Sequence, residues 1–544
     1  MLISIQKFTG IAPSIPPRQL AEYQAQVAVN CPMFYGSLQP LLDVGEIGLG
    51  FTLPGSGGPQ TIYRFGLDTL SDTEYWFVWN HDVNVVRGPI HGDDTERTYY
   101  CDGEYPKVTD NTLALSGAVQ YPAAYHRLGV PAPTLAPTLA VVGSATGSNP
   151  IAESRTYVYT WVTAWGEESA PSPPSDIVSV QPGQTVNLSA FDLPPSGAYP
   201  LASCRIYRST SGTFLLVAEI TLAQAQTASP GIVYSDTLLA EALGEACPSL
   251  TWLPPPAALT GLVLMPNGFL AGFVERDVYL SDPFHPFAWP VANIQPMDYP
   301  VVGLGVMNTT LCVLTKGQPY WIQGADPANV TVLPADINQA CVSKRSIVSM
   351  LGVVVYAGPD GLAVLNINGS SLLTEKLFKR AQWQALNPAS ISAFQFESQY
   401  IGFYNNGAPG GFLFDFVSNT FQMIDTHAVA GYYDRVQDTL YLAFADRSVK
   451  KWLQGAAKTY VWKSKRFTHP YPVNYVAAKV QAEDYPLTAL FYADGNLVLT
   501  QTVNDRFPFR LPAVAARDWE VELHGAVEVF AVALATSMDE LGHG

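Results

Sequence analysis

The chain has 544 residues, more than one hydrophobic core normally supports, so we expect two to four structural units. Charged residues make up 14% of the chain, against about 25% in a typical soluble domain, while Gly and Pro number 43 each. This balance, with 12% aromatic residues, favours strands and turns over helices. The formal net charge of −17 argues against a protein that grips nucleic acid by neutralising phosphates.

The N-terminal segment MLISIQKFTGIAPSIPP lacks a basic stretch followed by an apolar one, so we expect no secretory signal. No apolar run in the chain reaches the roughly 18 residues of a membrane-spanning helix, and we expect a protein made in the cytoplasm with no membrane-spanning segment. Next along the chain, RQLAEYQAQVAVN (18–30) predicts a helix of about three turns.

Pairs of apolar strands joined by Gly, Asp and Asn turns recur along much of the chain. One begins at Tyr75, and five more begin at Phe269, Leu311, Val353, Ile401 and Leu440. The spacing of the last five, about 40 to 50 residues, is typical of propeller blades. Turns such as GPDG and YNNG supply residues that tolerate positive φ and support hairpins. We therefore predict a mostly β chain with a β-propeller of about six blades.

A different kind of segment interrupts this repeat between two proline-rich stretches, GVPAPTLAPTLAVVG and LTWLPPPAALTG. Its alternating strand and its hairpin predict an inserted fibronectin type III or immunoglobulin-like β-sandwich. We therefore expect an N-terminal arm with the first blade or blades (1–135), the sandwich (136–250), the remaining blades (251–459) and a C-terminal closing β unit (460–544). A second short helix is expected in TEKLFKRAQWQALN (374–387).

Motifs for catalysis or metal binding are missing from the sequence. It contains no Gly-Lys dipeptide of a phosphate-binding loop, no G-x-S-x-G and no H-E-x-x-H. A propeller glycoside hydrolase would need two carboxylates, and Glu275, Asp277, Asp360 and Asp415 are possible ones, but they fall in turns where Asp is an ordinary residue. We predict no enzyme, no catalytic residues, no cofactor and no metal.

Six cysteines are scattered along the chain without C-x-x-C spacing, which favours buried free thiols over zinc ligands or disulfides. They are Cys31, Cys101, Cys204, Cys247, Cys312 and Cys341.

Both ends of the chain carry short motifs. The N-terminal motif residues are Phe8, Gly10, Pro13, Ala28, Asn30, Gly36, Leu38 and Pro40. The C-terminal ones are Trp462, Lys463, Lys465, Arg466 and Phe467, then the turn Tyr492–Gly495, FRLP at Phe509–Pro512 and the closing stretch Ala533–Leu541. In these motifs, about a fifth of its length, the chain resembles the tail nozzle or tail-stabilisation (tail tubular-type) structural proteins of short-tailed bacteriophages.

This resemblance implies a virion structural protein of the phage tail that forms a ring, expected to be a hexamer, and extends or closes the DNA ejection channel. The implied partners are portal-proximal adaptor proteins, tail fibres or spikes, and genomic double-stranded DNA that passes without specific binding. An acidic channel would repel phosphates and let DNA slide. A receptor- or glycan-binding tail component is the alternative, because the inserted sandwich could face outward; a hydrolase is a further one.

The basic element from Trp462 to Phe467 has two interpretations. Lysine and arginine stems can lie on aromatic faces with their charged heads on neighbouring acids, as at a packing edge or a subunit contact. The same cations could instead bind a ligand. We expect the structural role, with Trp462, Lys463, Lys465, Arg466 and Phe467 as candidate contact residues.

Overall fold

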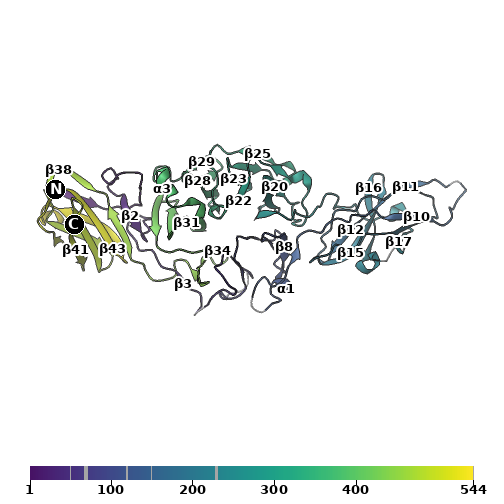
Figure 1. The fold of residues 1–544 in the computed structure, drawn as a ribbon, viewed down its shortest axis with the longest axis horizontal. Helices are drawn as coiled ribbons and strands as arrows, with labels where there is room; N and C mark the ends of the chain where they lie inside the picture. Colours follow the sequence, from purple (N-terminus) through teal and green to yellow (C-terminus); the bar gives the residue numbers. More distant parts are fainter. Residues whose placement is uncertain (49–50, 67–70, 118–119, 149, 227–230, 543–544) are drawn as a thin grey trace. The chain divides into compact units, whose positions relative to one another are not determined.

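The computed structural model describes residues 1–48, 51–66, 71–117, 120–148, 150–226 and 231–542. The chain divides into two compact units, each described by itself. The first comprises residues 1–82, 302–322 and 333–544, and the second comprises residues 83–301 and 323–332. Antiparallel strands dominate both, as the composition predicted, and Figure 1 shows them as a succession of small sheets along the sequence.

Arrays of four antiparallel strands make up most of the first unit, and the first array also includes residues of the second unit. They are β22-β23-β24-β25 (Val301–Met307, Thr310–Thr315, Tyr320–Gln323, Thr331–Pro334), β26-β27-β28-β29 (Val348–Met350, Val353–Ala357, Leu362–Asn366, Gly369–Leu372), β30-β31-β32-β33 (Ser392–Phe396, Gln399–Asn405, Pro409–Asp415, Thr420–Ile424) and β3-β36-β35-β34 (Gly45–Glu46, Val449–Lys451, Thr439–Ala443, Ala430–Asp434). Three of them run in chain order, and in the last a strand from the N-terminal region completes the sheet. The hairpin β4-β5 (Thr61–Arg64, Trp76–Trp79) packs against this last sheet.

The second unit contains two more sheets of the same kind. They are β6-β7-β8-β9 (Asn84–Arg87, Thr98–Cys101, Pro106–Thr109, His126–Arg127) and β18-β19-β20-β21 (Thr260–Leu264, Leu270–Val274, Asp277–Leu280, Gln295–Pro296). Consecutive strands paired in a meander are the construction of a propeller blade. The described residues thus form six four-stranded arrays of blade type, five of them separate sheets and one, β30 to β33, part of a ten-stranded sheet. The predicted fold class, mostly β with propeller blades, is confirmed.

The inserted sandwich lies in the second unit and has its own core. Its sheets are β10-β14-β17 (Thr138–Val142, Thr185–Ser189, Ile232–Asp236), β11-β13 (Glu153–Arg155, Val178–Val180) and β12-β15-β16 (Tyr157–Thr163, Leu201–Thr210, Thr213–Thr221). Tyr157, Tyr159 and Trp161 are buried in this core together with aliphatic residues of β14 and β15. The chain enters and leaves at one place, because a Cβ on Gly129 would lie 2.9 Å from Cα of Pro254.

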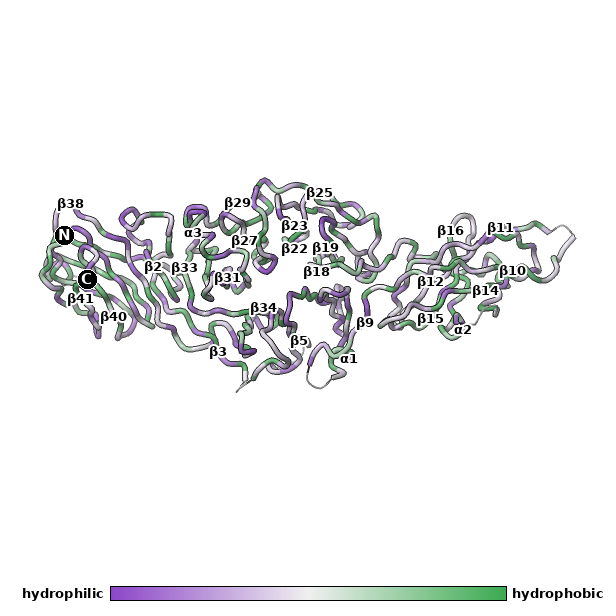
Figure 2. Tube along the Cα trace, viewed as in Figure 1, coloured by the Kyte–Doolittle hydropathy of each residue, from purple (hydrophilic) through white to green (hydrophobic). Residues whose placement is uncertain are grey.

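The C-terminal sandwich combines strands from both ends of the chain. One sheet is β1-β44-β39-β42 (Leu2–Ile5, Val529–Ala535, Ala477–Ala482, Phe509–Arg510). The other is formed by β2-β37-β43-β40-β41 (Ala25–Val29, Tyr460–Ser464, Ala515–Gly525, Leu487–Ala493, Asn496–Val503), with β38 (Phe467–Asn474) also paired to β43. A parallel bridge between Val29 of β2 and Met423 of β33 joins these strands to β30–β33 in one ten-stranded sheet. Figure 1 marks both termini in this sandwich, and in Figure 2 hydrophobic residues are interleaved with hydrophilic ones along its strands.

Helices are short. The α-helices are α1 (Asn111–Ala114), α2 (Leu222–Ala225) and α3 (Arg380–Gln384), and the 3₁₀ turns are Ala240–Ala242, Val291–Asn293, Pro327–Asn329, Lys344–Ser346, Pro388–Ser390 and Asp539–Leu541. The helix predicted over residues 18–30 is wrong: the segment turns and then forms strand β2, which pairs with β37. Hydrogen bonding to a neighbouring strand overrides a weak helix propensity. The helix predicted over residues 374–387 shrinks to the five residues of α3.

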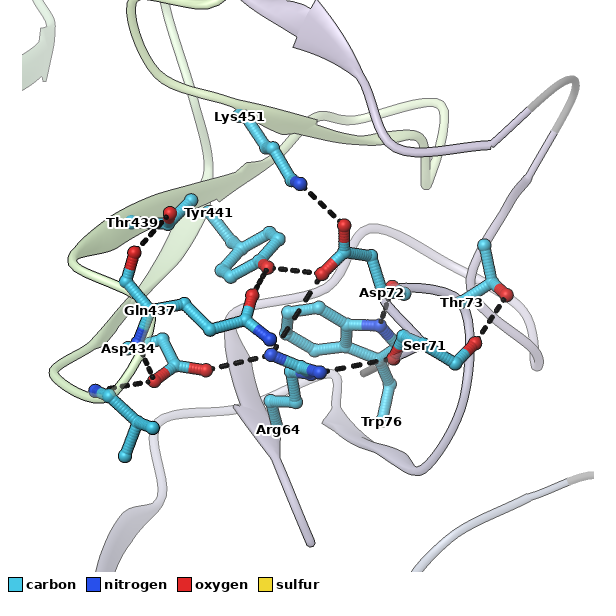
Figure 3. Close-up of polar contacts among 11 residues, drawn as sticks. Arg64, Ser71, Asp72, Thr73, Trp76, Asp434, Gln437, Thr439, Tyr441 and Lys451 are labelled. Carbon is cyan, nitrogen blue, oxygen red and sulfur yellow. Dashed lines mark hydrogen bonds and ion pairs between the residues drawn. The ribbon is translucent and has the colours of Figure 1, made fainter. Parts of the chain in front are cut away.

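A buried ion-pair network joins β4 to the sheet of β34, β35 and β36 (Figure 3). The Arg64 guanidinium, 3% exposed, lies 2.8 Å from a carboxylate oxygen of Asp434, and Lys451 lies 2.5 Å from Asp72. Burial raises the pKa of Asp72, but hydrogen bonds from Lys451 and Tyr441 and the charge of Arg64 outweigh it, so the pKa is lowered. A buried charge without an ionic partner costs free energy, and the ion pairs of this network offset part of that cost.

Candidate assembly site at the joined chain ends

The first motif residues pack the N-terminal arm onto the C-terminal sandwich. Phe8 is fully buried, and its ring lies edge-on to that of Trp462 with centroids 4.8 Å apart. The indole N–H of Trp462 donates to the carbonyl of Thr9 at 3.3 Å. A Cβ on Gly10 would lie 2.2 Å from the carbonyl oxygen of Phe421, so only glycine fits there. Phe8, Gly10 and Trp462 are therefore parts of one joint.

The remaining N-terminal motif residues shape the exit of the arm. Asn30 adopts a positive φ of 55°, and its side-chain oxygen accepts from the backbone N–H of Asp425 at 3.2 Å. Asparagine tolerates this conformation better than most residues. Gly36 also has positive φ, and Leu38 is fully buried and exchanges two backbone hydrogen bonds with Val529, both 2.9 Å long. The other three are the buried Ala28 and the half-buried Pro13 and Pro40.

Lys463 lies between aromatic and acidic neighbours. Its ammonium sits 3.8 Å from the ring centroid of Tyr492, and it lies 3.4 Å from Glu520 and 3.7 Å from Glu522. A cation over an aromatic face with a carboxylate beside it is held by both attractions. The side chain therefore stabilises the sheet between β37, β43 and β40.

Arg466 and Lys465 differ in their surroundings. The Arg466 guanidinium donates to Glu520 at 2.6 Å, and its backbone N–H donates to the carbonyl of Pro17 in the N-terminal arm. Lys465 extends over the ring of Phe467 at 5.8 Å, and within the described ranges no acidic side chain pairs with it. Phe467 itself is half-buried against the main core. Of the cations, Lys463 and Arg466 make the contacts of an ion-pair edge, and Lys465 does not.

Glu520 is the acid on which this cluster converges. Its side chain is 3% exposed and accepts from Arg466 and, at 3.0 Å, from Gln26 of β2. Burial raises the pKa of Glu520, but the hydrogen bonds from Arg466 and Gln26 and the charge of Lys463 outweigh it, and the pKa is lowered. The neighbouring Asp518 accepts from Thr468 and pairs with Arg18 of the arm at 2.7 Å. Glu520 and Asp518 thus bond both chain ends.

Sequence reasoning missed these acids and Tyr492 as contact residues. The segment DWEVELHG alternates charged and apolar residues, which places Asp518, Glu520 and Glu522 on one face of β43. That alternation was the available signal. The closing stretch also bonds the other end of the chain, because Glu540 lies 2.7 Å from the N-terminal ammonium group of Met1.

The residues of this site hold the two ends of the chain together. Its carboxylates are engaged by cations or hydrogen-bond donors, and burial raises the pKa of the Cys31 thiol well above its usual range. All six cysteines are buried and free, as predicted. Across the ranges given above, no group of three His, Cys, Asp or Glu side chains suits a metal ion. The helices within those ranges include none of the length and apolar character that a bilayer crossing requires.

Comparison with known proteins gives little. No family model matches the chain, and no curated protein does. Among solved structures it is similar to the RRP9 WD40 repeats (8% identity, 76% of this chain and 99% of that chain, TM-score 0.29) and to BBS1N in complex with ARL6DN (11% identity, 77% and 99%, TM-score 0.28). It is also similar to BamB from Moraxella catarrhalis (8% identity, 53% and 90%, TM-score 0.25). These TM-scores are too low to assign a fold from the similar structures. The fold class follows from the arrangement of the sheets described above.

Proposed function

We propose that this chain is a virion structural protein, a tail nozzle component of a short-tailed bacteriophage. In this proposal a homo-oligomeric ring, a hexamer, sits below the adaptor proteins and extends or closes the channel through which DNA leaves. The protein is made in the host cytoplasm and ends in the phage tail, in contact with tail fibres or spikes.

One observation carries the proposal. The motif residues that resemble nozzle proteins come from opposite ends of the sequence, yet Phe8 packs on Trp462, and Arg18 and Gln26 bond the acids Asp518 and Glu520 of β43. Motifs at the two ends of a chain need not meet. Their convergence supports reading them as one structural module, whose residues fasten the chain and perform no reaction.

The charge of the chain suits a channel component. With 46 acidic and 29 basic residues, the protein has little capacity to neutralise phosphates, and duplex DNA carries about one charge per 1.7 Å. Several of its cations are already paired with acids of the same chain, including Arg64, Lys107, Arg205 and Arg208. DNA would pass such a surface without adhering to it.

We assign no catalytic role to the turn carboxylates. Asp415 accepts from the hydroxyl of Ser398 at 2.8 Å and from the backbone and hydroxyl of Ser418 at 2.6 and 2.7 Å, which is the role of a turn-forming acid. Asp360 accepts from Gln339 and pairs with Arg380. Both carboxylates already have structural partners.

The test is assembly. The purified chain is mixed with the portal and adaptor proteins encoded beside it, and the products are imaged by electron microscopy. We expect an added ring of six copies around an axial channel at the distal end of the adaptor, and no retention of duplex DNA by the purified chain at physiological salt. The proposal would be contradicted if the chain did not bind the complex of portal and adaptor proteins and instead cleaved a polysaccharide.

A second candidate function, recognition of a receptor or a surface glycan, is favoured by the inserted sandwich. It has its own core and large exposed apolar side chains at Ile151, Ile177 and Leu193, each at least 75% exposed. A glycan array probed with the whole chain and with a chain lacking residues 132–250 tests it. A specific signal that disappears with the sandwich would support this candidate.

A further inference from the structure

Strand β41 lies at one end of the large sheet, after β43 and β40. Its residues pair with β40 on one side. On the other side, no backbone hydrogen bond reaches it from any part of the chain that the structure describes. Such an edge presents a row of N–H and C=O groups that another strand could bond.

Strand β38 is paired in this sheet with β43 alone among the described residues, so it also leaves one edge open, but its sequence differs from that of β41. Strand β38 carries Pro470 and Pro472, which lack the N–H needed for strand pairing. Strand β41 reads NLVLTQTV and has no charge, no proline and no glycine. Its register shifts once, opposite Phe491 and Tyr492, so the regular part is Leu499–Val503. This edge lacks the sequence features that normally prevent pairing.

The regular part of β41, LTQTV, is nearly the same read in either direction. In an antiparallel pair with a second copy, a two-fold axis through Gln501 would set Thr500 against Thr502, Gln501 against itself and Leu499 against Val503. The faces also match: Leu499 and Val503 lie opposite the buried Phe491 and Leu487, while Thr500 and Thr502 are exposed. Cross-strand Thr pairs are favourable, and no like charges meet.

We propose that β41 is a self-association edge, through which two copies of this chain join their sheets by antiparallel pairing about Gln501. The pairing is isologous, so each copy uses its edge once and this contact joins no more than two copies. The occupant is a second copy because the strand is complementary to itself. The inference rests on this edge and not on the proposed nozzle function.

The first test is the mass in solution. The wild-type chain should sediment at twice its 58.9 kDa, in a concentration-dependent equilibrium. Thr500→Lys with Thr502→Lys would set lysines against each other across the axis while leaving the sheet interior unchanged, and should give a monomer. A wild-type monomer at about 100 µM, or a lysine variant that still dimerises, overturns the proposal. The sixfold mass of a nozzle ring is distinct from either result.

The second test is a cross-link. Strand pairing brings the two copies of residue 501 to about 4.5–5.5 Å between Cα atoms, within disulfide range. The six native cysteines are buried, so a Gln501→Cys variant offers one accessible thiol per chain. It should form a covalent dimer on mild oxidation. Tyr471→Cys, on the proline-bearing edge and at a position 60% exposed, is the matched control and should remain monomeric. Equal cross-linking of both variants would contradict the proposal.

Discussion

The two sandwiches of this chain are assembled in opposite ways. The inserted sandwich uses one continuous stretch, entered beside Gly129 and left beside Pro254. The C-terminal sandwich takes β1 and β2 from the first 30 residues and its other strands from residues after 459. Because its strands come from one continuous stretch, the inserted sandwich can be removed without taking strands from other sheets. The C-terminal sandwich forms only when both ends of the chain are in place.

The buried charges of the two sandwiches differ in the same way, because one set has partners from a single stretch and the other has partners from both chain ends. In the inserted sandwich, Arg208 and Asp236 pair at 2.7 Å with side chains 1% and 0% exposed, and the hydroxyl of Tyr157 donates to the same carboxylate. All three residues belong to the insertion. At the joined ends, Glu520 of β43 is bonded by Gln26 of the arm. A buried charge that loses its partner is costly, so the second arrangement makes the two ends depend on each other.

Deleting segments should separate the two regions most strongly. Replacing residues 132–250 by a short Gly/Ser linker should leave the first unit folded, because its core contains no residue of that stretch. Deleting residues 1–42 should abolish its cooperative unfolding, because β1, β2, Phe8 and Leu38 disappear from the core. Calorimetry of both variants checks this. A chain without residues 1–42 that melts like the wild type would break the comparison.

Substitution of single buried tryptophans should then destabilise one sandwich at a time. Trp462→Ala removes a fully buried ring from the joined ends and should lower the free energy of unfolding of that body by about 3–5 kcal/mol. Trp161→Ala should cost the inserted sandwich a similar amount. Each substitution should move only its own thermal transition. If Trp462→Ala lowers the transition of the inserted sandwich instead, the two regions are not independent.

The two regions also differ in how well their structure could be predicted from the sequence. Hairpin turns and strand alternation predicted the blades and the insertion, because both depend on residues close in sequence. The segment 18–30 was predicted as a helix because its local propensity favours one, while its partner β37 lies more than 400 residues away. The role of Glu520 was missed for the same reason: its alternation is local, but its bonds to Gln26 and Arg466 are not.

The two regions should respond oppositely to pH. Burial raises the pKa of Glu167 in the inserted sandwich to about 7, and the charge of Arg97 lowers it only in part. Between about pH 4.5 and 7 the folded state therefore holds more protons than the unfolded state, and stability falls as pH rises, by up to about 3 kcal/mol. Glu167→Gln should remove this slope from denaturant unfolding measured across that range.

Glu520 should give the contrary sign. Its pKa is lowered, so its contribution is present above the pKa of an unfolded glutamate and is lost as pH falls through the folded value. Glu520→Gln should cost the joined ends about 1–3 kcal/mol at pH 7 and less in acid. Equal slopes for the two glutamine variants would show that the carboxylates do not differ as described.

The smallest expected effect distinguishes two neighbouring lysines. Lys463→Met removes the cation over Tyr492 and its pairing with Glu520 and Glu522, and should cost about 1 kcal/mol. Lys465→Met should change stability by less than about 0.5 kcal/mol. Urea unfolding of both variants measures the difference. Equal costs would mean that the ion pairs of Lys463 add nothing beyond its packing.

Hydrogen exchange of the native chain tests most directly whether its two ends form one body. The amides of β1, β2, β37, β39 and β44 should exchange with one common opening free energy. Trp462→Ala should lower that value for all five strands together and leave β12 and β15 of the inserted sandwich unchanged. If β1 and β2 exchange freely while β37 and β44 stay protected, or if the substitution affects β12 and β15, the account of the joined ends is wrong.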